Sequence, residues 1–489
     1  MTTPGRPIAG RNATAGRRIL EFSKFFIDGQ WVEPISARAL ELVNPATEQV
    51  YATAALGSVA DVHRAVLAAR EAVGSFSQTT PAERADLIER IVALLVRDQN
   101  QLLAAIVQEM GAPISMTAQV EMPTNAFRQA IKTLRAYDFE RTVDGHIVRR
   151  EAIGVCGLIA AWNWPMQNLC SKLAYALAAG CAVVAKPSEF TPGSALLLAG
   201  LLTEAGVPKG VFNLVPGDGP TVGRALSAHM DIDMVSITGS TRAGILVAEA
   251  AAPSVKRVAQ ELGGKSAHIV LPGADLAAAA RWNVARGFAN ASQSCHAPTR
   301  ILVRDRDLEP FLESVVSETA KIRVGDPLDP QTTMGPLANA AQFDKVQKYI
   351  QLGIEQGARL VTGGPGKPTN RDTGYFVQPT VFADVAPEMS IAEDEIFGPV
   401  LSVISYRNED QAIEIANASR YGLGGYVSGP DRDSGLRVAR QIKAGRIFFN
   451  NPPDNPAAPL GGYKQSGNGR ELGVFGLEEY LEVKAMIGF

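Results

Sequence analysis

Hydrophobic residues recur at helical spacing near the start of the chain and predict two long amphipathic helices. The first covers residues 58–76, where Ser58 is followed three positions later by Asp61 and then by an apolar face. A serine in front of such a face with an acid three residues on is typical of a helix N-terminus. The second pattern begins at Pro81 and ends at Gly111, a residue pair that favours a helix start and stop.

From residue 153 onward, strand-length apolar runs alternate with helix-length runs. The predicted strands are IGVCGLIAAW, CAVVAK, VFNLVP, DMVSIT and VKRVAQEL, and the predicted helices are PMQNLCSKLAYALAAG, SALLLAGLLTEAG, TVGRALSAH and TRAGILVAEAA. This order indicates an α/β fold with a doubly wound parallel sheet. Ligands bind such sheets at the carboxyl ends of the strands, so we expect chemistry in the loops WNWP, KPSE, PGDGP, TGST and ELGG.

The rest of the chain predicts a second α/β domain and a small β arm. A second alternation runs from AHIVLP through ILVRD to GRIFFN. The last stretch, LEVKAMIGF, is an exposed strand that needs a partner edge, and an alternating excursion precedes residue 153. We therefore expect a cofactor domain at 1–131 and 153–261, a catalytic domain at 262–456, and an oligomerisation arm with the C-terminal segment at 132–152 and 457–489.

Composition narrows the class of protein. Of 489 residues, 46% are hydrophobic and 20% charged, and the net charge is −3, which suits a globular protein and argues against nucleic-acid or anionic-membrane partners. Four cysteines form no CxxC pair, and five histidines show no metal spacing. We expect no metal site and a reducing, cytoplasmic setting.

Two segments invite a targeting or membrane interpretation. Residues 1–20 contain four arginines and no acid, without a continuous apolar core. That pattern excludes a secretory signal and favours a disordered tail over an organelle transit peptide. Residues 152–171 carry no formal charge but include Asn163, Gln167 and Asn168, which favours a buried core segment over a membrane span.

Three glycine-rich stretches fail the common nucleotide fingerprints. GGKS at 263–266 and GGPGKPT at 363–369 both lack the earlier glycine of a P-loop, and GDGPTVG has its third glycine one residue too late for GxGxxG. A glycine-rich turn between strand and helix still lets a ligand approach the backbone, so a nucleotide remains plausible at GDGPTVG.

Polar residues that follow the predicted strands are candidates for binding and catalysis. Lys186 and Glu189 can both bond a ribose diol, which favours NAD over NADP, although a solvated loop pair is an alternative. The amide of Asn163 suits an oxyanion, although Asn is also a common turn residue. A partly desolvated Glu261 suits a general base, and an ordinary rim carboxylate is the alternative of similar weight.

The stretch ASQSCHAPTR places Cys295 among small polar residues. A buried structural cysteine usually has apolar flanks, so these flanks favour an accessible, reactive thiol. His296 is adjacent, but neighbouring side chains on a strand point to opposite faces. We therefore expect His296 to be a poor base for Cys295.

These motifs together resemble the NAD(P)-dependent aldehyde dehydrogenase superfamily. The resemblance covers nearly the whole chain, through FIDGQWV, GVCGLIAAWNWP, VVAKPSEFTP, VPGDGPTVG, ITGSTRAG, ELGGKSAHIV, SQSCHAPTR, VGDPLDPQTTMGPL, EIFGPVLSV and PLGGYKQSGNGRELG. It implies that Cys295 is the nucleophile, Glu261 the general base and Asn163 an oxyanion donor, with Lys172 near the base. The cofactor residues that it implies are Trp162, Lys186, Ser188, Glu189, Gly219, Gly239, Ser240, Leu262, Glu395 and Phe397.

The implied activity is oxidation of an aldehyde to a carboxylic acid with NAD, in a homodimer or homotetramer. Ser188 leaves NADP use open, because its hydroxyl can bond a phosphate. A CoA-acylating dehydrogenase and a cysteine esterase are the alternatives. Glu261 argues against the first, since a water-activating base serves hydrolysis, and the second leaves KPSE and GST without a role.

The chain departs from the family pattern at Ala161, Ser292 and Leu460, where Pro, Gly and Phe are usual. None of these changes removes a reacting group. The resemblance leads us to expect a roomy, polar substrate pocket, similar to a subgroup that acts on ω-oxo acids and pyridine or aromatic semialdehydes. The expected pocket residues are Trp164, Asn168, Ser171, Ser294, His296 and Leu460.

Overall fold

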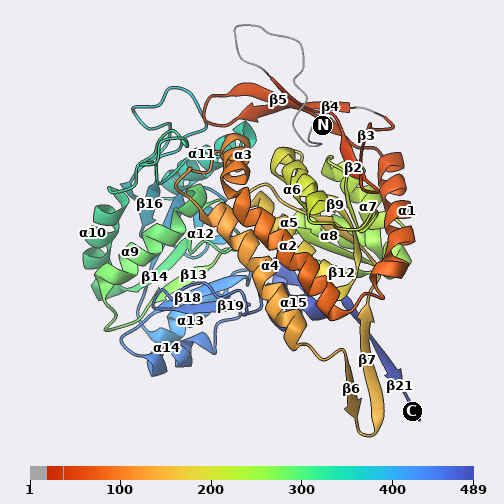
Figure 1. The fold of residues 1–489 in the computed structure, drawn as a ribbon. Helices are drawn as coiled ribbons and strands as arrows, with labels where there is room; N and C mark the ends of the chain where they lie inside the picture. The colour runs from red at the N-terminus through yellow and green to blue at the C-terminus, as the bar shows by residue number, and fades with distance from the viewer. Residues whose placement is uncertain (1–18, 37) are drawn as a thin grey trace.

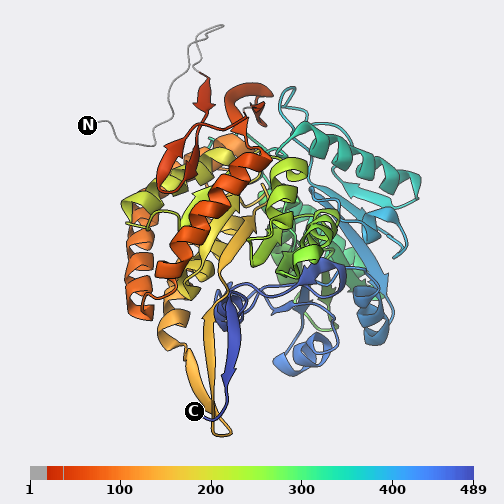
Figure 2. The same ribbon diagram turned by 90° about the vertical axis from the view of Figure 1, so that its right-hand side faces the viewer.

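A computed structural model describes residues 19–36 and 38–489. Two large sheets, each covered by helices, lie side by side, and two small three-stranded sheets complete the fold (Figures 1 and 2). The expected tail or transit peptide falls almost wholly outside the described residues. The α/β fold class is confirmed.

The first large sheet is doubly wound around five parallel strands. Its order is β20 (Gly467–Asn468), β12 (Arg257–Glu261), β11 (Met234–Thr238), β8 (Val155–Ile159), β9 (Ala182–Lys186), β10 (Phe212–Leu214), β2 (Phe25–Ile27) and β3 (Gln30–Val32). The strands from β12 to β10 are parallel. At one edge β20 pairs antiparallel with β12, and on the other side β2 pairs antiparallel with both β10 and the edge strand β3.

Helices cover both faces of this sheet with apolar side chains. One face packs against α1 (Val59–Phe76), α7 (Arg224–Ala228) and α8 (Thr241–Ala251). The other packs against α5 (Pro165–Ala179) and α6 (Pro192–Glu204), with α2 (Pro81–Arg97), α3 (Gln99–Met110) and α4 (Ala118–Ala136) in the same apolar cluster. Burial on both faces is why the central strands read as continuous apolar runs.

The second large sheet has the order β15 (Arg359–Thr362), β16 (Thr380–Ala383), β17 (Val400–Tyr406), β14 (Arg300–Arg304), β13 (Ala267–Val270), β18 (Gly424–Ser428) and β19 (Arg446–Phe449). Only the β15–β16 pair is antiparallel. Its helices are α9 (Leu276–Gly287), α10 (Leu308–Thr319), α11 (Ala340–Glu355), α12 (Ser390–Glu393), α13 (Glu409–Asn417) and α14 (Arg432–Ala439).

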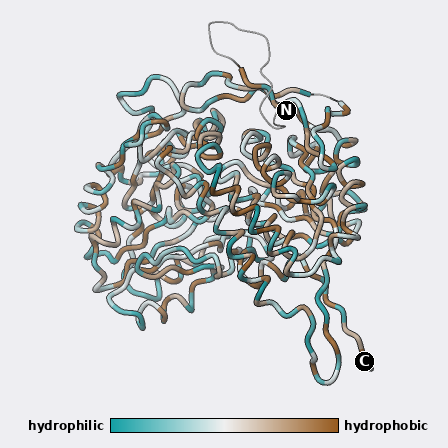
Figure 3. The backbone as a smooth tube through the Cα atoms, viewed as in Figure 1, coloured by the Kyte–Doolittle hydropathy of each residue, from teal (hydrophilic) through white to brown (hydrophobic). Residues whose placement is uncertain are grey.

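Two small sheets lie at the ends of the molecule. One joins β1 (Leu20–Phe22), β5 (Gln49–Leu56) and β4 (Arg38–Asn44). The other joins β21 (Leu481–Met486), β7 (His146–Ala152) and β6 (Glu140–Val143), and projects from the body as an arm that holds the C-terminus (Figure 1). Figure 3 shows hydrophobic stretches within the arm. Val143 of β6 and Val483 of β21 are exposed.

Three expectations about element boundaries are wrong. The helix expected from Pro81 to Gly111 breaks at Asp98, whose backbone leaves the helical region and divides it into α2 and α3. Residues 132–136, expected in the arm, continue α4 and pack with it against α5. TVGRALSAH begins as a wide π turn at 219–223 before α7.

The C-terminal segment is also divided differently from the expected 457–489 unit. β20 pairs with β12 of the first sheet, and α15 (Gly473–Glu478) packs against α4 and α5. Only β21 joins the arm, through its pairing with β7. The segment from 457 to 480 therefore belongs to the body of the molecule.

Among the described residues, none of the helices is both long and apolar enough to cross a membrane. Within the same residues, no group of three His, Cys, Asp or Glu side chains is arranged to hold a metal ion.

Candidate active site

The two large sheets meet through opposite strand ends. The first sheet supplies the loops that follow β8, β9, β11 and β12, as expected for carboxyl ends. The second sheet supplies the loops that precede β13, β14 and β17, at their amino ends. Contacts across this boundary bring Asn163, Glu261 and Cys295 into one region.

A strained loop precedes the nucleophile candidate. Asn290, Ala291 and Ser292 all have positive φ, at 55°, 53° and 57°. A left-handed conformation costs an L-residue roughly 1–2 kcal/mol, which explains why a glycine suits position 292. Ser292 keeps the conformation with its side chain, because Ser292 Oγ donates a hydrogen bond to Gly287 O.

Cys295 follows this loop in a turn and is partly exposed. The backbone of Cys295 lies close to Gly264, between β12 and β13. Only a glycine fits there, because a Cβ at Gly264 would lie 2.2 Å from Cys295 O. Burial, with smaller contributions from the charges of Glu261 and Glu395, raises the pKa of the Cys295 thiol.

His296 lies closer to the thiol than we expected. Residues 295 and 296 form a turn rather than a strand, so the two side chains share a side and Cys295 Sγ is 4.0 Å from His296 Nδ1. The argument from opposite strand faces is therefore wrong. His296 is nevertheless a weak base, because burial lowers the pKa of its imidazole to about 4.

Asn163 is buried against the cysteine loop. Its Nδ2 donates to Gln293 O at 2.9 Å, and its own backbone carbonyl accepts from Asn290 Nδ2 at 2.9 Å. Asn168 Nδ2 donates to Asn163 Oδ1 at 3.0 Å. The carbonyl end of the Asn163 amide is thus occupied, and its amino end faces the residues around Cys295.

Glu261 lies at the end of β12 in a cluster of buried charges. Burial, followed by the charge of Glu471, raises the pKa of Glu261 well above its usual range, and Lys172 opposes this shift. Lys172, fully buried, forms an ion pair with Glu471. Glu261 Oε1 is buried and has no hydrogen-bond partner in the described part of the chain.

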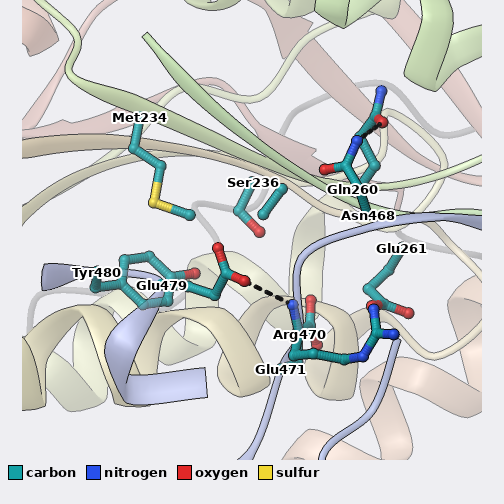
Figure 4. Close-up of a pocket in the computed structure, with 10 residues that line it drawn as sticks. Met234, Ser236, Gln260, Glu261, Asn468, Arg470, Glu471, Glu479 and Tyr480 are labelled. Carbon is teal, nitrogen blue, oxygen red and sulfur yellow. Dashed lines mark hydrogen bonds between the residues drawn. The ribbon is translucent and has the colours of Figure 1, made fainter. Parts of the chain in front are cut away.

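A small pocket opens on one side of Glu261 (Figure 4). Its polar lining includes Gln260, Asn468, Arg470, Glu471 and Glu479, and the figure shows Glu261 facing Arg470 and Glu471. The sequence analysis did not find Glu471. A lysine in the apolar run of α5 signals that some carboxylate must pair with it, but does not say which one.

The expected adenosine and phosphate residues follow β9, β10 and β11. Lys186 Nζ is 3.6 Å from Glu189 and donates to Pro187 O and Gly217 O, both at 2.8 Å. Ser188 Oγ accepts from Phe190 N at 3.3 Å. A Cβ at Gly219 would meet no atom within 4 Å, so this turn leaves open space beside the lysine.

The next loop ends at the N-terminus of α8. Ser240 caps this helix, with Ser240 Oγ accepting from Ala243 N at 3.2 Å, and both Ser240 and Gly239 are accessible. Leu262 is buried and packs on Gly244 of α8. A Cβ at Gly244 would come within 2.6 Å of the Leu262 side chain. A helix N-terminus with free N–H groups suits a pyrophosphate.

The nicotinamide-side residues come from the second sheet. Glu395 Oε1 accepts from Gly264 N at 2.9 Å, and a Cβ at Gly263 would lie 2.2 Å from Glu395 Oε2. Phe397 has a positive φ of 62° and meets Trp162 edge-to-face with centroids 5.4 Å apart. Glu189, Ser240 and Glu395 are at least partly accessible, and Lys186 is buried behind them. A ribose-binding ion pair, a helix N-terminus and a second carboxylate form a set of donors and acceptors that fits NAD.

The expected pocket residues separate into two groups. Trp164 Nε1 donates to Ser294 Oγ at 2.7 Å, which places both beside Cys295 together with His296. Ser171 makes a different contact: it is buried and donates to Glu471 Oε2 at 2.6 Å. Leu460 pairs with Glu471 through backbone hydrogen bonds in both directions.

Comparison with known proteins agrees with this arrangement. A family model for the aldehyde dehydrogenase family matches residues 31–486. The 3-succinoylsemialdehyde-pyridine dehydrogenase of a Pseudomonas species is 48% identical over 475 residues, which cover 96% of this chain and 99% of that protein.

Solved structures give the same result. A mutant of aldehyde dehydrogenase C from Pseudomonas syringae, in complex with NAD+ and octanal, matches with TM-score 0.95 and 51% identity over 96% of this chain and 97% of that one. Betaine aldehyde dehydrogenase from Staphylococcus aureus, in complex with NAD+, matches with TM-score 0.92 and 35% identity over 95% and 94% of the two chains. This chain belongs to the aldehyde dehydrogenase family.

Proposed function

We propose that the protein oxidises an aldehyde to the carboxylic acid with NAD, through a thioester on Cys295 that water hydrolyses. The observation that carries the proposal is the convergence of three groups across the sheet boundary. Cys295 lies against Gly264, the Asn163 amide contacts the same loop at Gln293 O, and the charge of Glu261 reaches the thiol. A nucleophile, an oxyanion donor and a base are the groups that this reaction needs.

In the first half of the reaction, Cys295 Sγ adds to the aldehyde carbon. The thiol proton is released to solvent as the thiolate forms, so Glu261, whose raised pKa makes it a stronger base than an exposed glutamate, is still free to take a proton from water in hydrolysis. Asn163 Nδ2 has a second hydrogen beyond the one it donates to Gln293 O, and this N–H and the Cys295 backbone N–H bind the oxyanion. Such a donor contributes about 2.7–4 kcal/mol to the transition state.

NAD, when bound, supplies the hydride acceptor that converts the adduct to a thioester. Lys186 and Glu189 would hold the adenosine ribose, Gly219 would leave room on the adenine side, and Ser240 at the N-terminus of α8 would contact the pyrophosphate. Glu395 and Phe397 would hold the nicotinamide half.

In the second half, Glu261 takes a proton from water, which attacks the thioester and releases the acid. Lys172 and Glu471 hold this carboxylate in a buried, charged setting. Glu261 Oε1, which is buried and without a partner among the described residues, is available to a water molecule.

For the substrate, we propose a larger or polar aldehyde, of the aromatic or semialdehyde class. Trp164 offers an aromatic wall, and Ser294 and His296 offer polar groups beside Cys295. The 48% identity to a 3-succinoylsemialdehyde-pyridine dehydrogenase supports this class.

We further propose a cytoplasmic homodimer or homotetramer that assembles through the arm. β6 and β21 are the two edge strands of the sheet β21–β7–β6. Each exposes an apolar side chain, Val143 on β6 and Val483 on β21. An exposed edge with apolar residues favours pairing with another chain. The four free cysteines suit a reducing compartment.

The test is NADH formation, followed by absorbance, from a panel of aldehydes with and without CoA. The proposal expects CoA-independent NADH formation, fastest with aromatic or semialdehyde substrates. Absence of NADH with every aldehyde would refute dehydrogenase activity, and a requirement for CoA would indicate the acylating alternative. Ester turnover that does not need NAD, in the absence of aldehyde oxidation, would indicate the esterase.

A further inference from the structure

The two ends of the Asn163 amide have nearly the same shape, but only one can donate to an oxyanion. A rotation of the amide by 180° would present Oδ1, an acceptor, to the developing negative charge. The orientation of the Asn163 amide therefore decides whether this side chain stabilises or opposes the reaction. Neighbouring groups must fix that orientation.

Two backbone carbonyls and the neighbouring Asn168 hold the orientation. Gln293 O only accepts, so the Asn163 atom 2.9 Å away is Nδ2. Ala161 O also only accepts, so the Asn168 atom 3.2 Å away is Nδ2, and this same atom lies 3.0 Å from Asn163 Oδ1. Each contact requires the next, and only one orientation of the two amides satisfies all of them.

The local fold places Asn168 for this contact. Pro165 begins α5 directly after Trp164, and Asn168 N donates to Trp164 O at 2.8 Å. The first turn of the helix thus carries the Asn168 side chain back over the loop that holds Ala161 and Asn163. Donation to Oδ1 also polarises the Asn163 amide, which strengthens its remaining N–H as a donor.

We infer that Asn168 is a positioning residue that fixes the donor end of the Asn163 amide toward the oxyanion. The inference rests on the proposed aldehyde oxidation. It replaces the expectation that Asn168 only lines the substrate pocket. A pocket residue would act on individual aldehydes according to their size, whereas a positioning residue acts on the same step for every aldehyde.

The test compares three variants. Asn168→Leu keeps the branched shape without the donor, Asn168→Asp presents an acceptor, and Asn168→Gln keeps the donor. We expect Asn168→Leu to lower kcat about tenfold for small and large aldehydes alike, and Asn168→Asp to lower it about 100-fold, approaching the loss of an oxyanion donor. Asn168→Gln should recover much of the loss. Gln167→Leu is the matched control, because it removes an amide from the same helical turn and should leave kcat within about twofold.

Two further readouts separate positioning from structure. Alkylation of Cys295 by iodoacetamide forms no oxyanion and should proceed at the wild-type rate in all three Asn168 variants. In an Asn163→Ala background, Asn168→Leu should cost no further kcat. An unchanged kcat in Asn168→Leu, a change confined to the KM of large aldehydes, or a full additional loss in the Asn163→Ala background would overturn the inference. Absence of NADH with the wild-type enzyme would instead refute the proposed function.

Discussion

The two large sheets build the site in opposite ways. The first presents the carboxyl ends of its parallel strands, and each functional side chain there lies at the end of its strand or within a few residues of it, as Lys186 does at the end of β9 and Glu261 at the end of β12. The second presents amino ends, so Cys295 and Glu395 come from long loops that precede β14 and β17. Regular strand ends hold the base and the oxyanion donor, while a strained loop holds the nucleophile.

The two halves of the site also differ in backbone conformation, because the loops of the second sheet contain non-glycine residues with positive φ. Three consecutive residues with positive φ lead to Cys295, and Phe397 also has positive φ. Such conformations persist only where surrounding contacts enforce them. Here the enforcing contacts come from both halves, through Asn290 Nδ2 at Asn163 O across the boundary and Ser292 Oγ at Gly287 O within the second half.

The largest effect should follow from disturbing the contact between the two halves at Gly264. In Gly264→Ala, the new Cβ would meet Cys295 O at 2.2 Å, so the nucleophile has to move. A displacement of about 1 Å lowers catalysis on the order of 100-fold, and we expect at least that loss in kcat/KM. Gly200→Ala, whose Cβ meets no atom within 4 Å, is the control and should keep full activity. Full activity in Gly264→Ala would mean that this contact does not position Cys295.

A smaller effect should appear in the pH profile and should trace to the first sheet. Burial raises the pKa of Glu261, and a general base works only when ionised. Turnover should therefore rise with pH, about tenfold per unit below that pKa, and level off above it. The steady-state rate between pH 5 and 10 measures this. A rise of the same slope in Glu261→Gln would assign the titration to another group.

The smallest effect concerns strain away from the site. Val255, which is 90% exposed, has φ 56° between α8 and β12. Val255→Gly removes the strain and loses no packing, so it should stabilise the protein by about 1 kcal/mol and leave kcat unchanged. Denaturant unfolding measures the first and the NADH assay the second. A destabilised Val255→Gly would show that the strain estimate does not hold for this fold.

The first sheet could be predicted from the sequence because its strand and helix patterns are regular and its functional residues come at strand ends. The second sheet could not be predicted to the same depth. No carboxyl-end rule points to Cys295 or Glu395. The small polar flanks of Cys295 indicated a reactive thiol, whereas its role as nucleophile and the choice of Glu395 came from resemblance to a family. The side chain of His296 was expected on the face opposite Cys295, which is wrong because the turn at 295–296 does not follow strand alternation.

Residues joined by long-range contacts were the hardest to predict. Ser171 has the helical position of a pocket residue, but its hydroxyl bonds Glu471, which is 300 residues away in the chain. The division of the segment from 457 to 480 was missed for the same reason, since β20 and α15 have no local pattern that reveals their packing on the first sheet. Only tertiary structure supplies these contacts.

The division of work between the sheets is tested most directly by a rapid-mixing experiment on Glu261→Gln. The second sheet supplies the nucleophile for thioester formation, and the first supplies the base for hydrolysis. The account predicts a burst of NADH that approaches one equivalent per Cys295, followed by turnover about 100-fold or more below wild type. Continued steady turnover at the wild-type rate would contradict the assignment of Glu261 as the base that activates water.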